Sequence, residues 1–204
     1  WNPRSVMFEV AWCVMLYTTV LALELSGMVF ERVGWKRAVS IQKAATIPLV
    51  LAGVLLSTLH QSSLGALYLI VPNKLHPLWY SPALPWIFWT SAIAAGLAMV
   101  IIESRLSSRA FGRPVEMHLL KDIARALLVA LGVFAVLRIY DLVHRGVIAE
   151  VFRPTYESGM FALEFVLGVL LPFALLLSPR TRTDIRRLYP TALLAVSGFL
   201  VNRL

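Results

Sequence analysis

Long apolar stretches alternate with short polar connections along the whole chain. A helix that crosses a membrane needs about 20 predominantly apolar residues, and six stretches meet this requirement. They are residues 5–30, 44–71, 85–102, 119–143, 158–178 and 189–204. Backbone inside lipid must satisfy its own hydrogen bonds, and stretches such as residues 47–59 lack the alternation of barrel strands. The pattern therefore predicts an all-α, polytopic transmembrane helix bundle with six membrane helices in this chain.

The connections between these segments are short and are marked by proline and glycine. None is long enough for a soluble domain, so we expect a single transmembrane helical domain over residues 1–204. The chain begins at Trp1 rather than at methionine, and it stops at Leu204 within an apolar stretch. We expect it to be a fragment of a longer membrane subunit.

Composition excludes several classes of protein. Hydrophobic residues make up 59% of the chain and charged residues 15%, whereas soluble domains average about 45–50% and 25%. The formal net charge is +8, but the basic residues lie in short connections between apolar stretches, which argues against nucleic-acid binding. Cys13 is the single cysteine. Internal disulfides and cysteine-ligated metal centres are therefore excluded, and any iron–sulfur cluster belongs to a partner subunit.

The basic residues are concentrated in every second connection between the predicted segments. Eleven lie in three connections: Arg32, Lys36, Arg37, Lys43, Arg105, Arg109, Arg113, Arg180, Arg182, Arg186 and Arg187. The opposite side has four: Arg4, Lys74, Arg145 and Arg153. The positive-inside rule places the richer side in the cytoplasm. Trp79, Tyr80, Trp86 and Trp89 surround an outer connection, where we expect them to act as anchors at the membrane interface.

Ionisable residues inside the predicted membrane segments are candidates for function, because each costs about 2.5–3.5 kcal/mol at the bilayer centre on insertion scales. Glu9 lies about one turn below the outer end of its segment, with apolar neighbours. It could exchange a proton, or pair with an arginine to hold helices together. Near the middle of segment 44–71, Ser57, His60 and Gln61 form one polar stripe at helical spacing. This stripe must face protein, water or a polar ligand headgroup.

The remaining ionisable residues lie toward the two faces of the membrane. Arg138 and Asp141 are three residues apart near the outer face, so they can neutralise each other, and Glu164 lies about two turns inside its own segment. The residues toward the cytoplasm are Tyr17 and Glu24, which share a helix stripe, and Glu103, at the end of segment 85–102. Together with His60 they suggest a broken proton path across the membrane. For Glu103, contact with headgroup water is an equal alternative.

A haem is not expected in this chain. A b-type haem needs two axial ligands, usually histidines, at matching depth on facing helices. Only His60 lies deep in a predicted segment, because His76, His118 and His144 lie in connections or at segment ends. Helices outside this chain would have to supply the missing ligands.

Two motifs carry a family resemblance. Residues 7–24, MFEVAWCVMLYTTVLALE, and residues 59–65, LHQSSLG, resemble the NrfD/PsrC family of quinone-interacting membrane subunits. Within that family the chain is most similar to the HybB-type subunits of periplasm-facing nickel–iron hydrogenases. The resemblance implies a subunit in a bacterial or archaeal cytoplasmic membrane, with additional helices outside this chain. It also implies electron exchange between an extracytoplasmic, ferredoxin-like iron–sulfur subunit and the quinone pool, either menaquinone or ubiquinone, with a nickel–iron hydrogenase as catalytic partner.

The same resemblance makes Glu9 and His60 candidate quinone-binding or proton-transfer residues, with Glu103 a further candidate. The residues support this interpretation independently, because quinone carbonyls need hydrogen-bond donors and two protons move with two electrons. An ion- or proton-coupled transporter is the main alternative, in which Glu9, His60 and Glu103 would relay the coupling ion. A purely structural anchor for a peripheral enzyme is a third, and it leaves the buried ionisable groups without a role.

Overall fold

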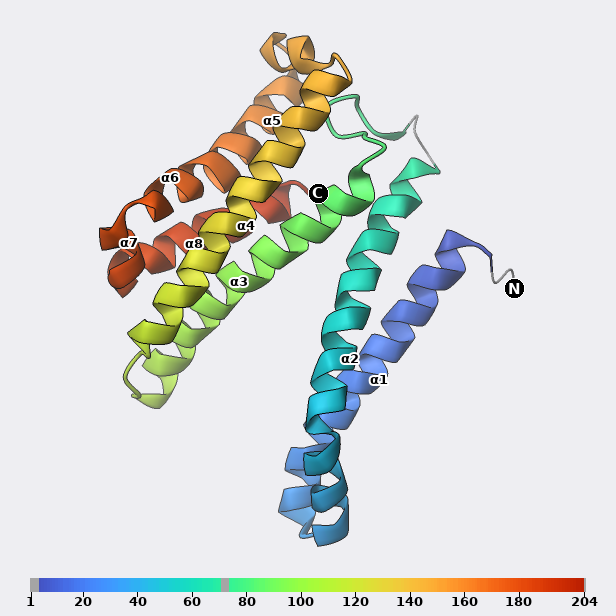
Figure 1. Cartoon of the computed structure of the whole chain (residues 1–204), viewed down its shortest axis with the longest axis vertical. Helices are drawn as coiled ribbons and strands as arrows, with labels where there is room; N and C mark the ends of the chain where they lie inside the picture. Colours follow the sequence, from blue (N-terminus) through green and yellow to red (C-terminus); the bar gives the residue numbers. More distant parts are fainter. Residues whose placement is uncertain (1–3, 71–73, 204) are drawn as a thin grey trace. The chain divides into compact units, whose positions relative to one another are not determined.

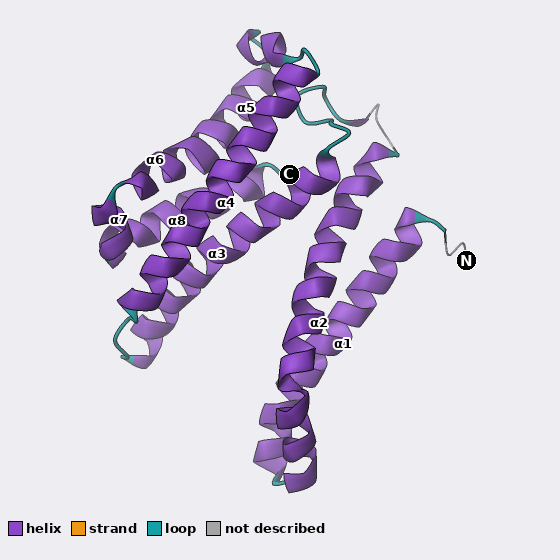
Figure 2. Cartoon of the chain, viewed as in Figure 1, coloured by secondary structure: helices purple, strands orange, loops and turns teal. Residues whose placement is uncertain are grey.

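The computed structural model describes residues 4–70 and 74–203, which contain helices and no strand (Figures 1 and 2). The α-helices are α1 (Val6–Val33), α2 (Lys36–Leu69), α3 (Leu84–Phe111), α4 (Met117–His144), α5 (Tyr156–Phe165), α6 (Leu171–Leu177), α7 (Pro179–Thr183) and α8 (Ile185–Val201). A 3-10 helix, η2 (Ile148–Phe152), precedes α5, and a π-helical segment, η3 (Val166–Leu170), joins α5 to α6. The predicted all-α class is confirmed.

All six predicted membrane segments are found as helices. Five stretches are long and apolar enough to cross a membrane, namely α1, α2, α3, α4 and Tyr156–Leu177. The sixth segment corresponds to α8, which has 17 residues. The chain is therefore a multi-pass membrane protein, as predicted. The predicted ends at residues 71 and 204 lie outside the described residues.

Two predicted boundaries were wrong at the face predicted to be cytoplasmic. Helix α2 begins at Lys36 rather than at residue 44, and α3 continues to Phe111 rather than ending at residue 102. The first turns of α2 and the last turns of α3 are polar, so the apolar segments that we used for prediction stop short of them. The helices themselves continue through these polar turns. A 28-residue helix such as α3 is about 42 Å long, compared with about 30 Å of hydrocarbon.

The chain forms two compact units, Trp1–Val71 and Pro72–Leu204. We describe each unit by itself. The expectation of one membrane domain over residues 1–204 stays a prediction.

The first unit is an antiparallel pair of helices, α1 and α2. Buried residues of α1 recur every seventh position, at Cys13, Val20 and Gly27, and form the seam that faces α2. Gly34, with φ of 76°, ends α1, because its left-handed backbone conformation lets the chain turn into α2. At this end of the pair, Lys43 lies 3.4 Å from Glu31. The seam fixes which residues of α2 meet each residue of α1.

The second unit contains α3 to α8. Helix α3 packs against α4 and α8, and α6 packs against α4 and α8. Fully buried residues repeat at three- and four-residue spacing, as in Ala94, Ala98 and Ile101 of α3 and in Leu127 and Leu131 of α4. These stripes form one apolar core inside the unit.

The π-helical segment lies at a close approach to α8. Pro172 lacks the N–H that would bond to the carbonyl of Gly168 in a regular α-helix, and the preceding turn widens. Gly168 then lies directly against Gly198 of α8. A Cβ atom added at Gly198 would lie 2.1 Å from the Cα of Gly168. Only glycine permits this crossing without displacement of backbone.

Gly198→Ala should therefore destabilise the second unit. The new methyl group meets backbone, which cannot rotate away, so we expect a loss of about 1–3 kcal/mol and a lower melting temperature. The measurement is thermal unfolding of the full-length protein in detergent. Gly96→Ala is the matched control, because a Cβ atom there meets nothing within 4 Å. An equal loss in both variants would contradict the close crossing.

Candidate functional site

In the first unit, Glu9 and Ser63 form a hydrogen bond between the two helices. The Ser63 hydroxyl donates to Oε1 of Glu9 over 2.8 Å. Ser63 is buried, with 5% of its surface exposed. Glu9 lies four residues before Cys13, so it shares the face of α1 that meets α2. The seam between the helices thus holds a carboxylate whose partner is a hydroxyl group.

His60 lies one turn before Ser63 on α2, on the same helix face. Its Nδ1 atom is buried and has no hydrogen-bond partner among the described residues. A buried polar atom without a partner costs about 1–3 kcal/mol. The imidazole is therefore available to a polar group that the described residues do not supply. Ser57 and Gln61, the other members of the predicted stripe, are half-buried beside it.

The position of His60 along α2 can be compared with its position in the predicted segment. It lies 9 residues before the end of α2 at Leu69 and 24 residues after the start at Lys36. At 1.5 Å per residue these separations are about 14 Å and 36 Å. His60 therefore lies nearer the Leu69 end than the middle of α2, although it is near the middle of segment 44–71, because α2 is longer than its apolar segment. Glu9 and His60 both belong to the half of the helix pair that holds the start of α1 and the end of α2.

The predicted proton-path residues are less closely grouped. Tyr17 and Glu24 are half-buried on α1, about 12 Å and 22 Å along the helix from Glu9. Glu103 is exposed on α3, in the second unit. A path from His60 to these residues stays a prediction.

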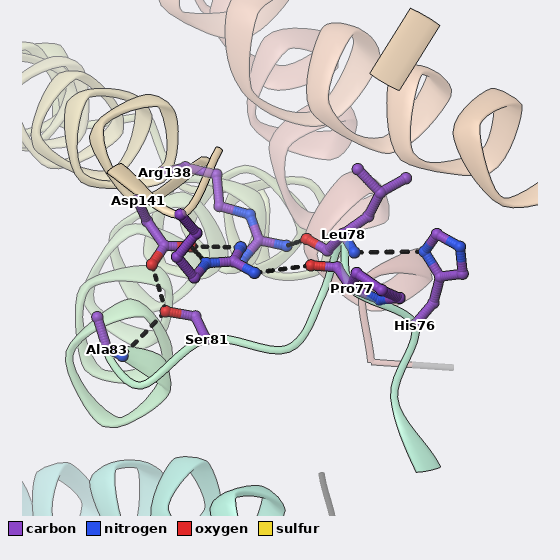
Figure 3. A network of polar contacts seen from close by, with 8 residues as sticks. His76, Pro77, Leu78, Ser81, Ala83, Arg138 and Asp141 are labelled. Carbon is purple, nitrogen blue, oxygen red and sulfur yellow. Dashed lines mark hydrogen bonds and ion pairs between the residues drawn. The ribbon is translucent and has the colours of Figure 1, made fainter. Parts of the chain in front are cut away.

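A polar network joins residues 76–83 to α4 in the second unit, at the end predicted to be outer (Figure 3). Asp141 of α4 is buried and forms an ion pair with Arg145, with 2.7 Å between Oδ2 and Nη2. The Ser81 hydroxyl donates to the other oxygen of Asp141 over 2.5 Å. Arg138 donates to the carbonyl of Leu78 over 3.0 Å. The network fastens the connection between α2 and α3 onto α4.

We expected Arg138 and Asp141 to neutralise each other as a pair, but each has another direct partner. Asp141 pairs with Arg145, four residues on, whose guanidinium holds the carboxylate through both Nε and Nη2. Arg138 instead reaches the backbone of Leu78 and lies over the ring of Phe161, 5.4 Å from its centre. Arg145 also donates to the carbonyl of Pro77 over 2.8 Å. Both arginines thus hold adjacent carbonyls of the same connection.

Glu164 of α5 is buried, with 5% of its surface exposed, and it is hydrogen-bonded on both oxygens. Trp79 donates to Oε2 over 3.0 Å, and Asn202 donates to Oε1. Trp79, which we expected to be an interfacial anchor, therefore links its connection to α5, and it also packs edge-on against Phe161. Arg138, Asp141 and Glu164 each have hydrogen-bond partners within this unit.

Sequence reasoning missed several residues of these sites. Ser63, Ser81 and Asn202 are ordinary polar residues in the sequence, and only the packing of helices shows what they bond to. Arg203, beside the C-terminal end of α8, donates to the hydroxyl of Ser91 over 2.6 Å. The sequence feature that could have identified them is their position as polar residues within or beside apolar stretches.

The helix pair is better suited to proton transfer and polar ligand binding than to metal binding. No group of three metal-ligating side chains of the His, Cys, Asp and Glu types occurs in the described part of the chain. Glu9 and His60 instead provide a titratable carboxylate and a titratable imidazole on adjacent helices. The Ser63 hydroxyl holds the carboxylate toward the seam.

Comparison with known proteins gives a consistent result. The pattern of the family described as "Polysulphide reductase, NrfD" matches residues 2–204. A protein of Escherichia coli (strain K12) named "Probable Ni/Fe-hydrogenase 2 b-type cytochrome subunit" is 36% identical over 208 residues, covering 100% of this chain and 52% of that protein. The "Menaquinone reductase, integral membrane subunit" of Nitratidesulfovibrio vulgaris (Hildenborough) is 27% identical over 229 residues, covering 99% of this chain and 54% of that protein.

A second protein of the same Nitratidesulfovibrio strain is 47% identical over 121 residues, which cover 59% of this chain and 31% of that protein. The chain thus spans about half the length of two of these relatives and less of the third. No solved structure matches it.

Proposed function

Because the chain belongs to the polysulphide reductase NrfD family, we propose that it is the quinone-reacting part of an integral membrane subunit of a respiratory oxidoreductase. The observation that carries the proposal is the seam between α1 and α2. There the buried Ser63 hydroxyl donates to the Glu9 carboxylate, and one turn before Ser63 on α2 lies His60, whose Nδ1 atom has no partner among the described residues. The name of one relative refers to a quinone, since it is a menaquinone reductase subunit.

The chemistry assigns a task to each residue. Reduction of a quinone to the quinol takes two electrons and two protons, and oxidation releases them. The electrons pass to or from iron–sulfur clusters of a partner subunit, because this chain has one cysteine. His60 bonds to one quinone oxygen, and Glu9 exchanges a proton with the reacting quinone. Ser63 keeps the Glu9 carboxylate in the seam and accessible to the quinone.

The partners follow from the same relatives. One is named as a hydrogenase 2 subunit and another as a menaquinone reductase subunit. We propose an extracytoplasmic, ferredoxin-like iron–sulfur subunit and a catalytic oxidoreductase subunit, a nickel–iron hydrogenase, as partners of this chain. The quinone is menaquinone or ubiquinone, and the membrane is the cytoplasmic membrane of a bacterium or archaeon.

Haem does not fit the histidines of this chain, although the name of the Escherichia coli relative includes a b-type cytochrome. His60 lies inside a membrane helix, but His76 lies in a connection, where its Nδ1 accepts from the backbone N–H of Leu78. His118 and His144 are exposed at the two ends of α4. A bis-histidine site needs two ligands at matching depth, and this chain offers one deep histidine. We assign no haem to it.

Purification of the full-length protein from its native membrane tests the proposed assembly. An iron–sulfur spectrum and a catalytic subunit should co-purify with it. A protein that is stable alone and that drives substrate uptake in vesicles would instead support the alternative of an ion- or proton-coupled transporter.

Energy coupling gives a separate prediction. If protons reach the quinone from the cytoplasmic side past Glu24 and Glu103, each charge that crosses the full potential is worth about 2.3 kcal/mol per 100 mV. Glu24→Gln/Glu103→Gln should then slow quinone turnover in sealed vesicles and make it insensitive to a protonophore. Turnover with and without the protonophore, compared with wild type, is the measurement. Equal rates and equal voltage sensitivity would assign both carboxylates to the membrane interface.

A further inference from the structure

A cavity of about 350 Å³, open to the surface, lies between the last turns of α3 and the first turns of α4. Its polar lining comes from Glu103, Ser104 and Ser107 of α3 and from Arg113 and Glu116 of the following connection. Its apolar wall includes Val100, Leu119, Leu120 and Ile123. The cavity belongs entirely to the second unit and is separate from the Glu9–Ser63 pair. The proposed Glu9–His60 site does not use it, and of its lining residues Glu103 alone is also a candidate for the proton path.

The backbone holds Arg113 at this cavity. Gly112, with φ of 63°, ends α3 and turns the chain. The N–H of Arg113 then donates to the carbonyl of Ser108 over 3.1 Å, and the Ser108 hydroxyl donates to the carbonyl of Arg113 over 2.5 Å. Two hydrogen bonds to one residue therefore fix the start of the Arg113 side chain.

The charged side chains around the cavity are available to a ligand. Within the described ranges, no ion pair engages Glu103, Arg113 or Glu116, whereas the nearby Asp122 is paired with Arg125. One positive and two negative groups thus share a small space with serine hydroxyls. An anion alone would meet two carboxylates, and a cation alone would meet the guanidinium. A ligand with both charges can satisfy both signs.

The depth of the cavity indicates where such a ligand comes from. Helix α3 has 28 residues, and Glu103 is its 20th, about 28 Å from its start. Hydrocarbon is about 30 Å thick, so if α3 starts at the opposite edge of the hydrocarbon, the polar lining begins where the headgroup layer begins. The apolar wall continues from Glu103 toward the hydrocarbon through Val100. A lipid would place its headgroup among the charges and its glycerol against this wall.

We propose that the cavity binds the headgroup of a phosphatidylethanolamine lipid. Arg113 and the hydroxyls of Ser104 and Ser107 bind the phosphate, and Glu116 and Glu103 bind the ammonium. Lipids of the leaflet predicted to be cytoplasmic supply the ligand. The proposal is independent of the Glu9–His60 site, because it uses residues of the other unit, of which only Glu103 is also a candidate for the proton path.

The test measures which lipids remain bound to the purified complex. The full-length complex is placed in nanodiscs of equal phosphatidylethanolamine and phosphatidylglycerol, extracted in mild detergent, and analysed by native mass spectrometry. Wild type should retain phosphatidylethanolamine over phosphatidylglycerol. Arg113→Gln should reduce retention of the former about tenfold, since it removes a charge-assisted hydrogen bond to phosphate. Glu116→Gln should reduce the preference between the two lipids.

Arg109→Gln is the matched control, because Arg109 is exposed at the same end of α3 and does not line the cavity. It should retain lipid as wild type does, and all three variants should keep quinone turnover. Soluble glycerophosphoethanolamine, which has no acyl chains, should displace the lipid poorly. The proposal is overturned if wild type shows no preference, if Arg109→Gln matches Arg113→Gln, or if the soluble compound displaces the lipid readily.

Discussion

Glu9→Gln and His60→Ala should each reduce quinone-dependent turnover of the assembled complex by about 100-fold or more, the lower range of effects for loss of a general acid or base. Glutamine keeps the shape of the side chain and can still accept from Ser63, but it cannot carry a proton. Alanine removes the imidazole whose Nδ1 atom has no partner among the described residues. Activity with an artificial dye should survive, because the dye reacts with the partner subunits.

Glu31→Gln is the matched control for Glu9→Gln. Both carboxylates are exposed, but Glu31 lies 3.4 Å from Lys43 at the other end of the pair, whereas Glu9 accepts from Ser63. Its replacement should leave quinone turnover within about twofold of wild type, as expected for a surface ion pair. Ser63→Ala should give an intermediate loss, since it frees the Glu9 side chain without removing the carboxylate. Normal turnover in both Glu9→Gln and His60→Ala would show that the pair is misassigned.

Asp141→Ala should destabilise the second unit by about 3–5 kcal/mol, the usual cost of removing one partner from a buried ion pair. Asp141 is 7% exposed. Its loss leaves the guanidinium of Arg145 and the hydroxyl of Ser81 without their acceptor. We expect a lower melting temperature and faster proteolysis within residues 74–83, because the network fastens that connection to α4.

Asp122→Ala provides the comparison on the same helix. Asp122 pairs with Arg125 at 2.9 Å, but both side chains are exposed. Its removal should cost less than about 1 kcal/mol and leave proteolysis unchanged. The structural assignment of the network fails if the two variants melt at the same temperature.

Hydropathy predicted the helices well, because a bilayer imposes one simple requirement on every spanning segment. It placed helix ends poorly. The last turns of α3, around Arg105 and Arg109, are polar and read as a connection, although they continue the helix to Phe111. The π-helical segment at Val166–Leu170 was also not predicted, because Pro172 alone signals a disturbed turn without specifying its form.

Candidate site residues were predictable where a charge interrupts an apolar stretch, as Glu9 and His60 do. Their partners were not predictable, since the bond between Glu9 and Ser63 depends on how α1 and α2 are aligned. The partners of Arg138 were hidden for a further reason. It bonds to the backbone carbonyl of Leu78, and every residue has such a carbonyl, so the sequence cannot show which one is the acceptor. The cavity beside Arg113 likewise depends on how α3 and α4 meet.

The central claim is that quinone reacts at the seam between α1 and α2, and photo-crosslinking tests it most directly. A photoreactive azidoquinone is bound to the full-length complex, illuminated, and located by peptide mass spectrometry. We expect labelled peptides from Val6–Val33 and Lys36–Leu69, with labelling suppressed by excess native quinone and reduced in His60→Ala. Competed labelling confined to Leu84–Val201 or to other parts of the complex, with none on α1 or α2, would contradict the claim.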